Sequence, residues 1–353
     1  MNTRSLTGIR GLAILLVIFS HAADLGVRPH PWVDFIGVGR YGVFLFFVLS
    51  AFLLTRQYLR AFPAADPGGS AVYFRYTLCY LRRRFWRIFP LYVAALLVYF
   101  LLYETGHGIY PVDTSMALKS LFLFDATGIF WTIPVEFEYY FLIPLVALAA
   151  IRIRKPAMVI AAFALLIFGW SRLVPPHYEA DLSPFLPVFL IGSLAAAVSE
   201  MIASGKPPIT VPAWLFNIAA GLGLAAFFIL FPRYFRWISG LPVGNTMFHD
   251  RFLLWGFLSA GLIVATLHGD GWVRGLMEHP ALVFWGEISF SAYLGHMVIL
   301  KSVHHFLPGL SAAAQWWLFA ALTAALSWFA YRYLECPAMR WGRVRPLFSG
   351  ASA

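Results

Sequence analysis

The sequence has few charged residues and almost no cysteine. Asp, Glu, Lys and Arg together make up 12% of the 353 residues, and the two cysteines are Cys79 and Cys336. A soluble domain carries about 25% charged residues, so this chain lacks the polar surface that such a fold needs. Two cysteines do not form a disulfide framework, and we find no internal repeat and no low-complexity tract. These absences exclude a soluble enzyme, a small disulfide-rich protein and a repeat protein.

Long apolar segments are what the sequence has instead. Hydrophobic residues make up 61% of the chain. A run of about 20 apolar residues is long enough to cross a bilayer as a helix. We count ten such runs, at residues 7–26, 35–55, 88–103, 133–151, 156–172, 184–202, 211–231, 251–268, 281–303 and 312–335. We therefore predict a single all-α membrane domain over residues 1–353, built as a bundle of about ten transmembrane helices.

Basic residues are unevenly distributed among the connecting segments. If the N-terminus is cytoplasmic, the segments on that side carry sixteen Lys and Arg, against seven on the other side. The positive-inside rule then predicts that both termini are cytoplasmic. The net charge of +10 therefore serves topology, with membrane lipids as the natural partners of these residues. We expect no nucleic-acid partner, because the basic residues flank spans and do not line a soluble face.

Two ionisable residues, Arg10 and His21, lie inside the first apolar segment. On a helix, eleven residue steps come to about 20° less than three whole turns, so both side chains point the same way. They are then separated by roughly 16 Å along the helix axis. An ionisable side chain in hydrocarbon costs at least a few kcal/mol, so such a residue indicates a functional site.

A basic block precedes the third span, at residues 81–92. It contains four arginines in six residues, and Arg84 and Arg87 are three apart, so they share one helix face. Guanidinium groups bind phosphate oxygens in a bidentate manner, which favours an anion site. The alternative is a topology signal that contacts only lipid phosphates.

Two further polar groups lie in apolar segments. Glu136 and Tyr139 are three apart at the start of the fourth span, which places a carboxylate and a phenol on one stripe. His296 lies in the ninth span, where a histidine that merely packs is the alternative. Near the end of the tenth span we expect Arg332 to pair with Glu335, and Pro337 to end the helix. For Glu136 we consider three roles: the carboxylate orients an imidazole, it contacts a substrate hydroxyl, or it lies at the interface with a nearby arginine that satisfies its charge.

Six blocks in this order resemble the acyltransferase family 3 of integral membrane proteins, which acylate bacterial surface sugars, lipids and some antibiotics. The blocks are Arg10-x10-His21, Phe46-Phe47-Val48-Leu49-Ser50-Ala51-Phe52-Leu53, Arg84-x-x-Arg87-Ile88-x-Pro90-x-Tyr92, Trp131-Thr132-Ile133-Pro134-Val135-Glu136, Ile288-Ser289-Phe290-Ser291-Ala292-Tyr293-Leu294-Gly295-His296 and Glu335-Cys336-Pro337. The chain departs from the family at four positions. The family frequently has Gly at the position of Ala51 and Gln at the position of Glu138. It commonly has Trp at the position of Gly295 and Arg at the position of Cys336.

The resemblance implies a ten-span enzyme of the bacterial cytoplasmic membrane that uses acyl-CoA, with acetyl-CoA expected, and no metal. His21 is then the leading catalytic residue, Arg10 lies near the donor, and Arg84 with Arg87 binds the CoA phosphates. We expect transfer of the acyl group to a hydroxyl of a sugar or glycolipid, with His21 as general base or, second, as an acyl carrier. Glu136 or Ser20 would orient the imidazole.

Tyr139 and His296 would contact substrate in that reaction. The rival hypothesis is a secondary transporter or flippase of a sugar-lipid, because such proteins also carry ionisable residues within their spans. Transporters usually show two inverted repeats, and we find no such symmetry in this sequence.

Overall fold

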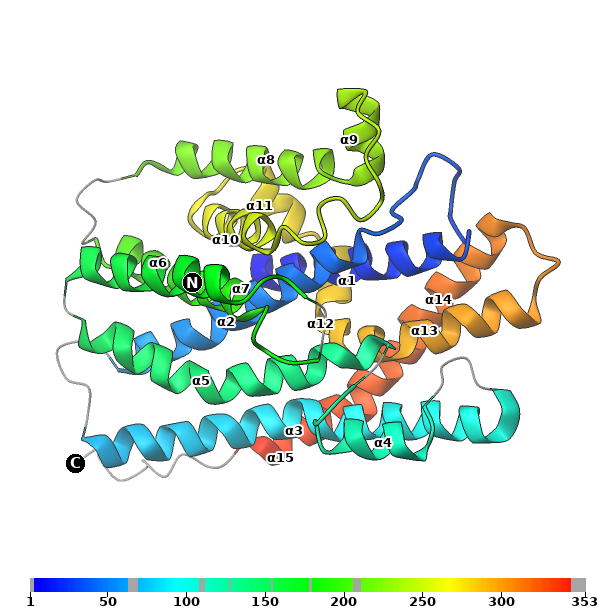
Figure 1. Ribbon diagram of the computed structural model, residues 1–353, viewed down its shortest axis with the longest axis horizontal. Coiled ribbons are helices and arrows are strands. Elements are labelled where there is room, and N and C mark those ends of the chain that lie inside the picture. The colour runs from blue at the N-terminus through cyan, green and yellow to red at the C-terminus, as the bar shows by residue number, and fades with distance from the viewer. Residues whose placement is uncertain are drawn as a thin grey trace.

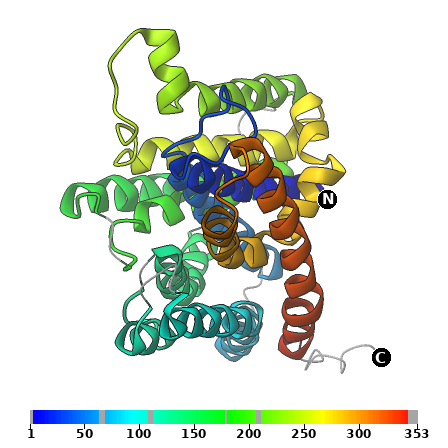
Figure 2. The same ribbon diagram turned by 90° about the vertical axis from the view of Figure 1, so that its right-hand side faces the viewer.

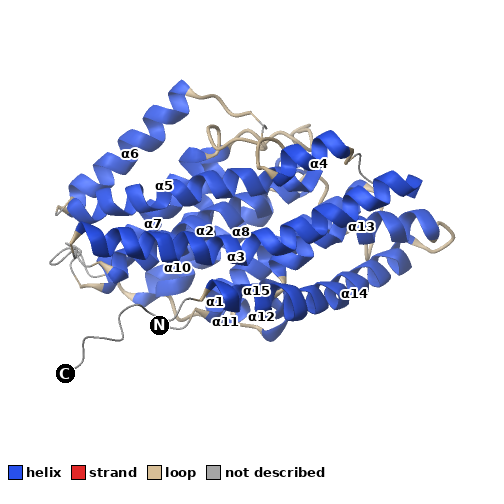
Figure 3. Ribbon diagram, turned by 90° about the horizontal axis from the view of Figure 1, so that it is seen from below, coloured by secondary structure: helices blue, strands red, loops and turns tan. Residues whose placement is uncertain are grey.

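The computed structural model describes residues 3–62, 69–107, 112–126, 128–153, 155–177, 180–205 and 211–343. Within these ranges the chain forms helices and connecting loops and no strand (Figure 3). The helices are α1 (Arg4–Asp24), α2 (Gly39–Ala61), α3 (Ser70–Leu102), η1 (Tyr103–His107), α4 (Thr114–Leu121), η2 (Gly128–Trp131), α5 (Thr132–Arg152), α6 (Pro156–Leu173), α7 (Leu186–Ala203), α8 (Ala213–Ile229), α9 (Pro232–Ser239), α10 (Phe252–His268), α11 (Trp272–Met277), α12 (Pro280–Glu287), α13 (Ser289–Phe306), α14 (Ala312–Ala330), η3 (Tyr331–Glu335) and α15 (Cys336–Gly342). The all-α membrane fold predicted from composition is confirmed.

Fewer of the described helices than the ten predicted runs meet the length and hydropathy expected of a membrane crossing. In the described residues, seven helices are long and apolar enough to cross a membrane, or up to nine if each of two bent pairs is one span. The pairs are α8 with α9, bent by 92°, and α12 with α13, bent by 79°, while α10 is a shorter apolar helix. The figure of about ten spans and the cytoplasmic placement of both termini stay predictions. Residues 1–2 and 344–353, and the basic residues Arg154, Lys206 and Arg345, lie outside the described ranges.

Two helices form the centre of the bundle. The apolar windows of α1 and α2 are 67% and 72% buried within the protein, whereas that of the peripheral helix α6 is 17% buried. In Figure 1 the long helices run side by side, and Figure 2, which looks along the bundle, shows α1 near the middle. An apolar helix that faces lipid needs no protein cover, so the buried pair marks where an interior site can form.

Small residues let α1 and α12 approach closely. A Cβ atom at Gly11 would lie 2.0 Å from the backbone oxygen of Leu282, and one at Gly286 would lie 1.8 Å from that of Thr7. Without a hydrophobic driving force between them, membrane helices gain from such close van der Waals packing. Because α13 follows directly after α12, this contact fixes where α13 begins beside α1.

The C-terminal end of the bundle differs from the sequence expectation. Pro337 does not end the helix: it lies in the first turn of α15, which continues from α14 through the π-helical turn η3. The predicted pair of Arg332 with Glu335 is also wrong, because Arg332 is exposed and Glu335 is fully buried. The i→i+5 winding of a π turn moves two side chains that are three apart off the face they share on an α-helix.

Replacing Gly11 with Ala should destabilise the protein. The added methyl group meets a backbone carbonyl that cannot turn away, and overpacking of this kind costs about 1–3 kcal/mol. We expect a lower midpoint in thermal unfolding of the detergent-solubilised protein. Gly169→Ala in α6 is the matched control, since no atom lies within 4 Å of its Cβ position. An equal midpoint for both variants would contradict the close contact.

Candidate active site

A pocket opens within the bundle, between α1, α2, α3, α5 and α13. Its walls combine apolar and polar side chains, and the polar side chains come from several facing helices. The lining residues are Arg10, Val43, Phe46, Phe47, Leu49, Ser50, Arg84, Arg87, Ile88, Thr132, Ile133, Glu136, Tyr140, Ser289, Phe290 and Tyr293. Convergent polar groups set among apolar walls are typical of a small-molecule site.

The cavity collects charge from three helices. Arg10 comes from α1, Arg84 and Arg87 from adjacent turns of α3, and Glu136 from α5. The hydroxyl of Tyr140, one turn further along α5, donates to the Glu136 carboxylate at 2.7 Å. Three guanidinium groups against one carboxylate give the cavity wall a positive excess, which favours an anionic ligand.

A carboxylate behind the wall holds one of these arginines. Glu335 has no exposed surface, and its Oε1 lies 3.7 Å from Nη2 of Arg87. The hydroxyl of Ser291 donates to the other carboxylate oxygen at 3.0 Å. In contrast, Nε of Arg84 is buried without a hydrogen-bond partner among the described residues. The arginine cluster is therefore anchored on one side and has donor capacity left for a ligand.

A histidine pair lies further along α1. Nδ1 of His21 is 2.8 Å from Nε2 of His296 on α13, and the two rings lie edge to edge, 17° from parallel, with centroids 5.1 Å apart. His296 has no exposed surface, whereas His21 keeps part of its surface accessible. Neither histidine is among the residues that line the cavity.

Tyr293 forms the wall between the cavity and the histidine pair. It lines the cavity, and its ring centroid is 5.9 Å from that of His296, one turn along α13. Its hydroxyl donates to the backbone oxygen of Ile129 at 2.8 Å and receives a hydrogen bond from Thr132. Because α1 is one continuous helix, Arg10 in the cavity and His21 at the pair are about 16 Å apart along its axis.

The structure gathers most of the residues that the sequence singled out. Arg10, Arg84, Arg87 and Glu136 share the cavity, and His21 meets His296. Glu136 and Ser20, expected to orient the imidazole, do not contact it: Glu136 bonds to Tyr140, and the Ser20 side chain faces Gly39 of α2. Here the expectation was wrong, because α13 brings His296 to the position where a carboxylate was sought.

Tyr139 points away from the cavity. Its hydroxyl lies 2.6 Å from that of Ser193 on α7, which in turn lies 2.7 Å from the hydroxyl of Thr55 on α2. Tyr139 is fully buried in this network and does not line the cavity. The carboxylate–phenol stripe of α5 therefore pairs Glu136 with Tyr140, four residues on. A substrate contact by Tyr139 stays an untested prediction.

Several residues of the site were missed from the sequence. Thr132, Tyr140, Ser291 and Tyr293 each make a hydrogen bond at or behind the cavity. All four lie in or next to the blocks that were singled out, so polarity within an apolar span was the available signal. In the described part of the chain, no three His, Cys, Asp or Glu side chains form a group that could hold a metal ion.

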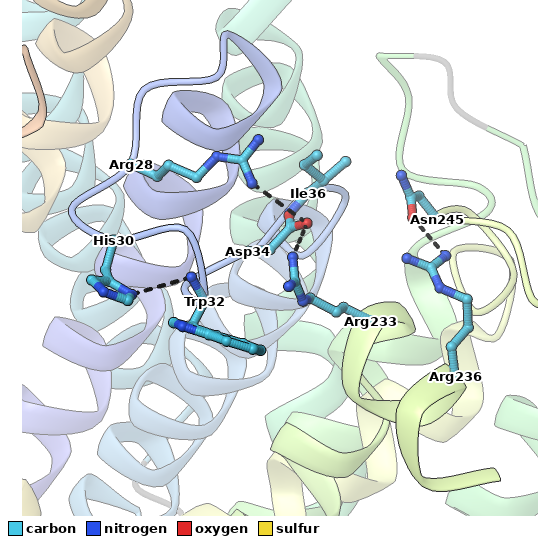
Figure 4. A network of polar contacts seen from close by, with 8 residues as sticks. All are labelled: Arg28, His30, Trp32, Asp34, Ile36, Arg233, Arg236 and Asn245. Carbon is cyan, nitrogen blue, oxygen red and sulfur yellow. Dashed lines mark hydrogen bonds and ion pairs between the residues drawn. The ribbon is translucent and has the colours of Figure 1, made fainter. Parts of the chain in front are cut away.

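The loop that follows His21 is tied to the neighbouring segments. The Asp34 carboxylate accepts from Arg233 of α9 at 2.8 Å and lies 3.8 Å from Arg28 (Figure 4). Beyond it, Nε2 of His249 donates to the backbone oxygen of Gly37 at 2.6 Å. These contacts fix the chain between α1 and α2, and with it the end of α1 that carries His21.

A buried arginine cavity and, further along α1, a histidine pair lie inside an apolar helical bundle, an arrangement that fits a membrane enzyme. Residues 3–332 match the acyltransferase domain family. The chain therefore belongs to this family, acyltransferase family 3, and it is a membrane acyltransferase.

Individual relatives are distant but cover most of this chain. Nodulation protein 10 of Rhizobium leguminosarum bv. viciae is 23% identical, over 94% of this chain and 92% of its own length. A Staphylococcus aureus (strain COL) protein named as an O-acetyltransferase is 22% identical over 96% of this chain, which spans 57% of that protein. A protein of Acidianus two-tailed virus named as an acetyltransferase is 24% identical over 86% of both chains. No solved structure matches the sequence.

His249 should make the folded protein sensitive to acid. Burial lowers the pKa of His249 below its ordinary value of 6.5, and the positive charge of Arg40 acts in the same direction. The unfolded chain then binds the proton more readily, so this contribution to stability is present above about pH 6.5 and is lost as the pH falls toward the folded pKa.

His249→Gln keeps a donor for the Gly37 oxygen and cannot be protonated. We expect its thermal midpoint to fall less than that of the wild type between about pH 7.5 and about pH 5. Thermal unfolding across this pH range checks the difference. Parallel pH profiles for the two proteins would mean that His249 is not the titrating group.

Proposed function

We propose that this protein transfers an acyl group, most simply acetyl, from acyl-CoA to a hydroxyl of a carbohydrate-containing acceptor at the bacterial cytoplasmic membrane. The observation that carries the proposal is the arrangement along α1. Arg10 lies in the arginine cavity, and about 16 Å along the helix axis His21 lies in the histidine pair. The family supplies the reaction type, and the names of two relatives include acetyl transfer.

The arginine cluster suits the phosphates of CoA. Arg84 and Arg87 present two guanidinium groups from one face of α3, and the buried Nε of Arg84 has no protein acceptor among the described residues. Guanidinium forks bind phosphate oxygens through paired hydrogen bonds. Arg10 continues this positive surface onto α1, and so toward His21. An extended pantetheine arm would cover the distance between the two ends of the site.

Acyl transfer needs a base at the thioester. In the proposed reaction His21 takes the proton of the acceptor hydroxyl while the hydroxyl oxygen attacks the thioester carbonyl carbon. The carbon–sulfur bond then breaks, the CoA thiolate leaves, and it receives the proton from the His21 imidazolium. The products are the O-acylated acceptor and CoA with a free thiol. The variant in which the acyl group first bonds to His21 ranks second.

Of the roles considered for Glu136 from the sequence, substrate contact is the one that this proposal keeps. Its carboxylate lies in the cavity with Tyr140 and not at the imidazole. We therefore assign the pair to substrate contact, where a carboxylate and a phenol can bind hydroxyl or amide groups of donor or acceptor. The carbohydrate acceptor itself is proposed from the resemblance to the family.

Changing His21 to Ala should abolish acyl transfer. Loss of a general base costs typically about 10²–10⁴-fold in rate. The purified protein is incubated with radiolabelled acetyl-CoA and a membrane glycan extract from the host, and labelled products are separated and identified by mass spectrometry. His305→Ala, an exposed histidine at the end of α13, is the matched control and should behave as the wild type.

Two outcomes would count against the proposal. Undiminished product formation by His21→Ala would remove His21 as the base. Binding of acetyl-CoA or glycan by the wild-type protein with no hydrolysis and no transfer would instead favour the transporter or flippase hypothesis.

Replacing both Arg84 and Arg87 with Gln should chiefly raise the KM for acetyl-CoA. Each charge-assisted hydrogen bond contributes about 1.5–3 kcal/mol, so we expect an increase of at least about tenfold. Initial rates at varied donor concentration measure this. Arg75→Gln, an exposed arginine of the same helix, is the control for the loss of positive charge. An unchanged donor dependence would mean that Arg84 and Arg87 serve topology alone.

A further inference from the structure

We infer that His296 fixes the tautomer of His21, so that Nε2 of His21 is the atom that takes the acceptor proton. This inference rests on the proposed function and deepens it. It makes His296 a positioning residue, where the sequence suggested a substrate contact. The hydrogen bonds of the pair, taken in order from the backbone of α13 to His21, determine which nitrogen of each ring carries a proton.

Nδ1 of His296 is within hydrogen-bond distance of two backbone carbonyl oxygens. This atom lies 2.7 Å from the backbone oxygen of Tyr293 and 3.1 Å from that of Ala292. A carbonyl oxygen can only accept a hydrogen bond, so Nδ1 must carry a hydrogen. A neutral imidazole has one N–H, so Nε2 of a neutral His296 is a bare acceptor.

The tautomer of His296 in turn determines the tautomer of His21. Nε2 of His296 faces Nδ1 of His21 at 2.8 Å, a distance at which one of the two nitrogens must donate. Since Nε2 of His296 is bare, Nδ1 of His21 carries the hydrogen. The hydrogen bond at one ring nitrogen decides the state of the other, so the lone pair of neutral His21 is on Nε2. That nitrogen lies on the side of the ring away from His296.

A charged His296 would reverse this assignment, and its surroundings disfavour the charge. The side chain has no exposed surface, and its hydrogen-bond partners among the described residues are two carbonyl groups and an imidazole. No carboxylate is among them. An ionised group buried without a counter-charge carries a large desolvation cost. His296 therefore stays neutral and keeps its proton throughout the reaction.

The two histidines thus have separate tasks. The acceptor proton bonds to Nε2 of His21, stays there on the imidazolium, and leaves to the CoA thiolate, while the proton on Nδ1 of each ring is retained. His21 is partly accessible, as the reacting residue must be, whereas His296 is enclosed. The arrangement does with a neutral imidazole what a carboxylate does in a Ser-His-Asp triad, namely select one tautomer and one ring orientation.

Nitrogen NMR tests the tautomers without any assay of activity. The full-length protein is labelled with [¹⁵N]histidine and reconstituted in lipid nanodiscs, and the two signals are assigned by their loss in His21→Ala and His296→Ala. We expect both rings to be neutral, each with a protonated Nδ1 and a bare Nε2. A hydrogen on Nε2 of neutral His21, or a doubly protonated His296, would overturn the inference even if His21 proves to be the base.

A matched pair of variants tests the consequence for catalysis. His296→Gln places a carboxamide near the former Nε2, where its oxygen can accept from His21. His296→Asn is one methylene shorter, so it reaches the carbonyl groups of α13 but not His21. We expect kcat to fall about 10- to 100-fold in the Asn variant, and less in the Gln variant, because an unfixed base loses part of its contribution.

The KM for acetyl-CoA should stay within about twofold of the wild type in both variants, because neither change touches the arginine cavity. Equal kcat values for the Asn variant and the wild type would contradict the positioning role. A matching rise in the KM of both variants would point to a general structural effect and count against it too. If neither variant folds, the NMR of the wild-type protein still decides the question. Absence of transfer by the wild type, with the expected tautomers present, would reject the proposed function and leave the tautomer assignment standing.

Discussion

The cost of enclosing polar groups in an apolar bundle governs this structure. Arg87 is held by Glu335, Glu136 by Tyr140, and His296 by two backbone carbonyl groups. Each contact offsets part of the desolvation cost of placing these polar groups inside the bundle. Among the groups of the site, Nε of Arg84 is buried without a hydrogen-bond partner in the described residues, and His21 is only partly buried. Both are groups that the proposed chemistry uses.

Helix packing decides which polar groups can meet. The close contact of α1 with α12 at Gly11 and Gly286 fixes the position of the bend between α12 and α13. As a result α13 packs beside α1 and places His296 next to His21. A broken helix inside a bundle exposes backbone groups at its break, which is tolerated where protein surrounds it. In this molecule the break also brings a second histidine to the first.

Periodicity and composition were sufficient for the coarse features of the molecule. Apolar runs predicted the helices, and the eleven-residue step predicted that Arg10 and His21 share a face of α1. Pairings between distant segments could not be obtained this way: α13 approaches α1 by tertiary packing, so the partner of His21 was sought in Glu136 or Ser20. The π turn η3 likewise has no signature in the periodicity, which is why Arg332 was wrongly paired with Glu335.

The continuity of α1 has a consequence for how this sequence can change. Arg10 and His21 are linked by uninterrupted helix, so no loop between them can absorb a change of length. Inserting or deleting one residue would turn His21 by about 100° relative to Arg10 and shift it by about 1.5 Å. His21 would then face away from His296, or Arg10 away from the cavity. The number of residues between Arg10 and His21 therefore sets both their separation and their relative direction, whichever side chains lie between them.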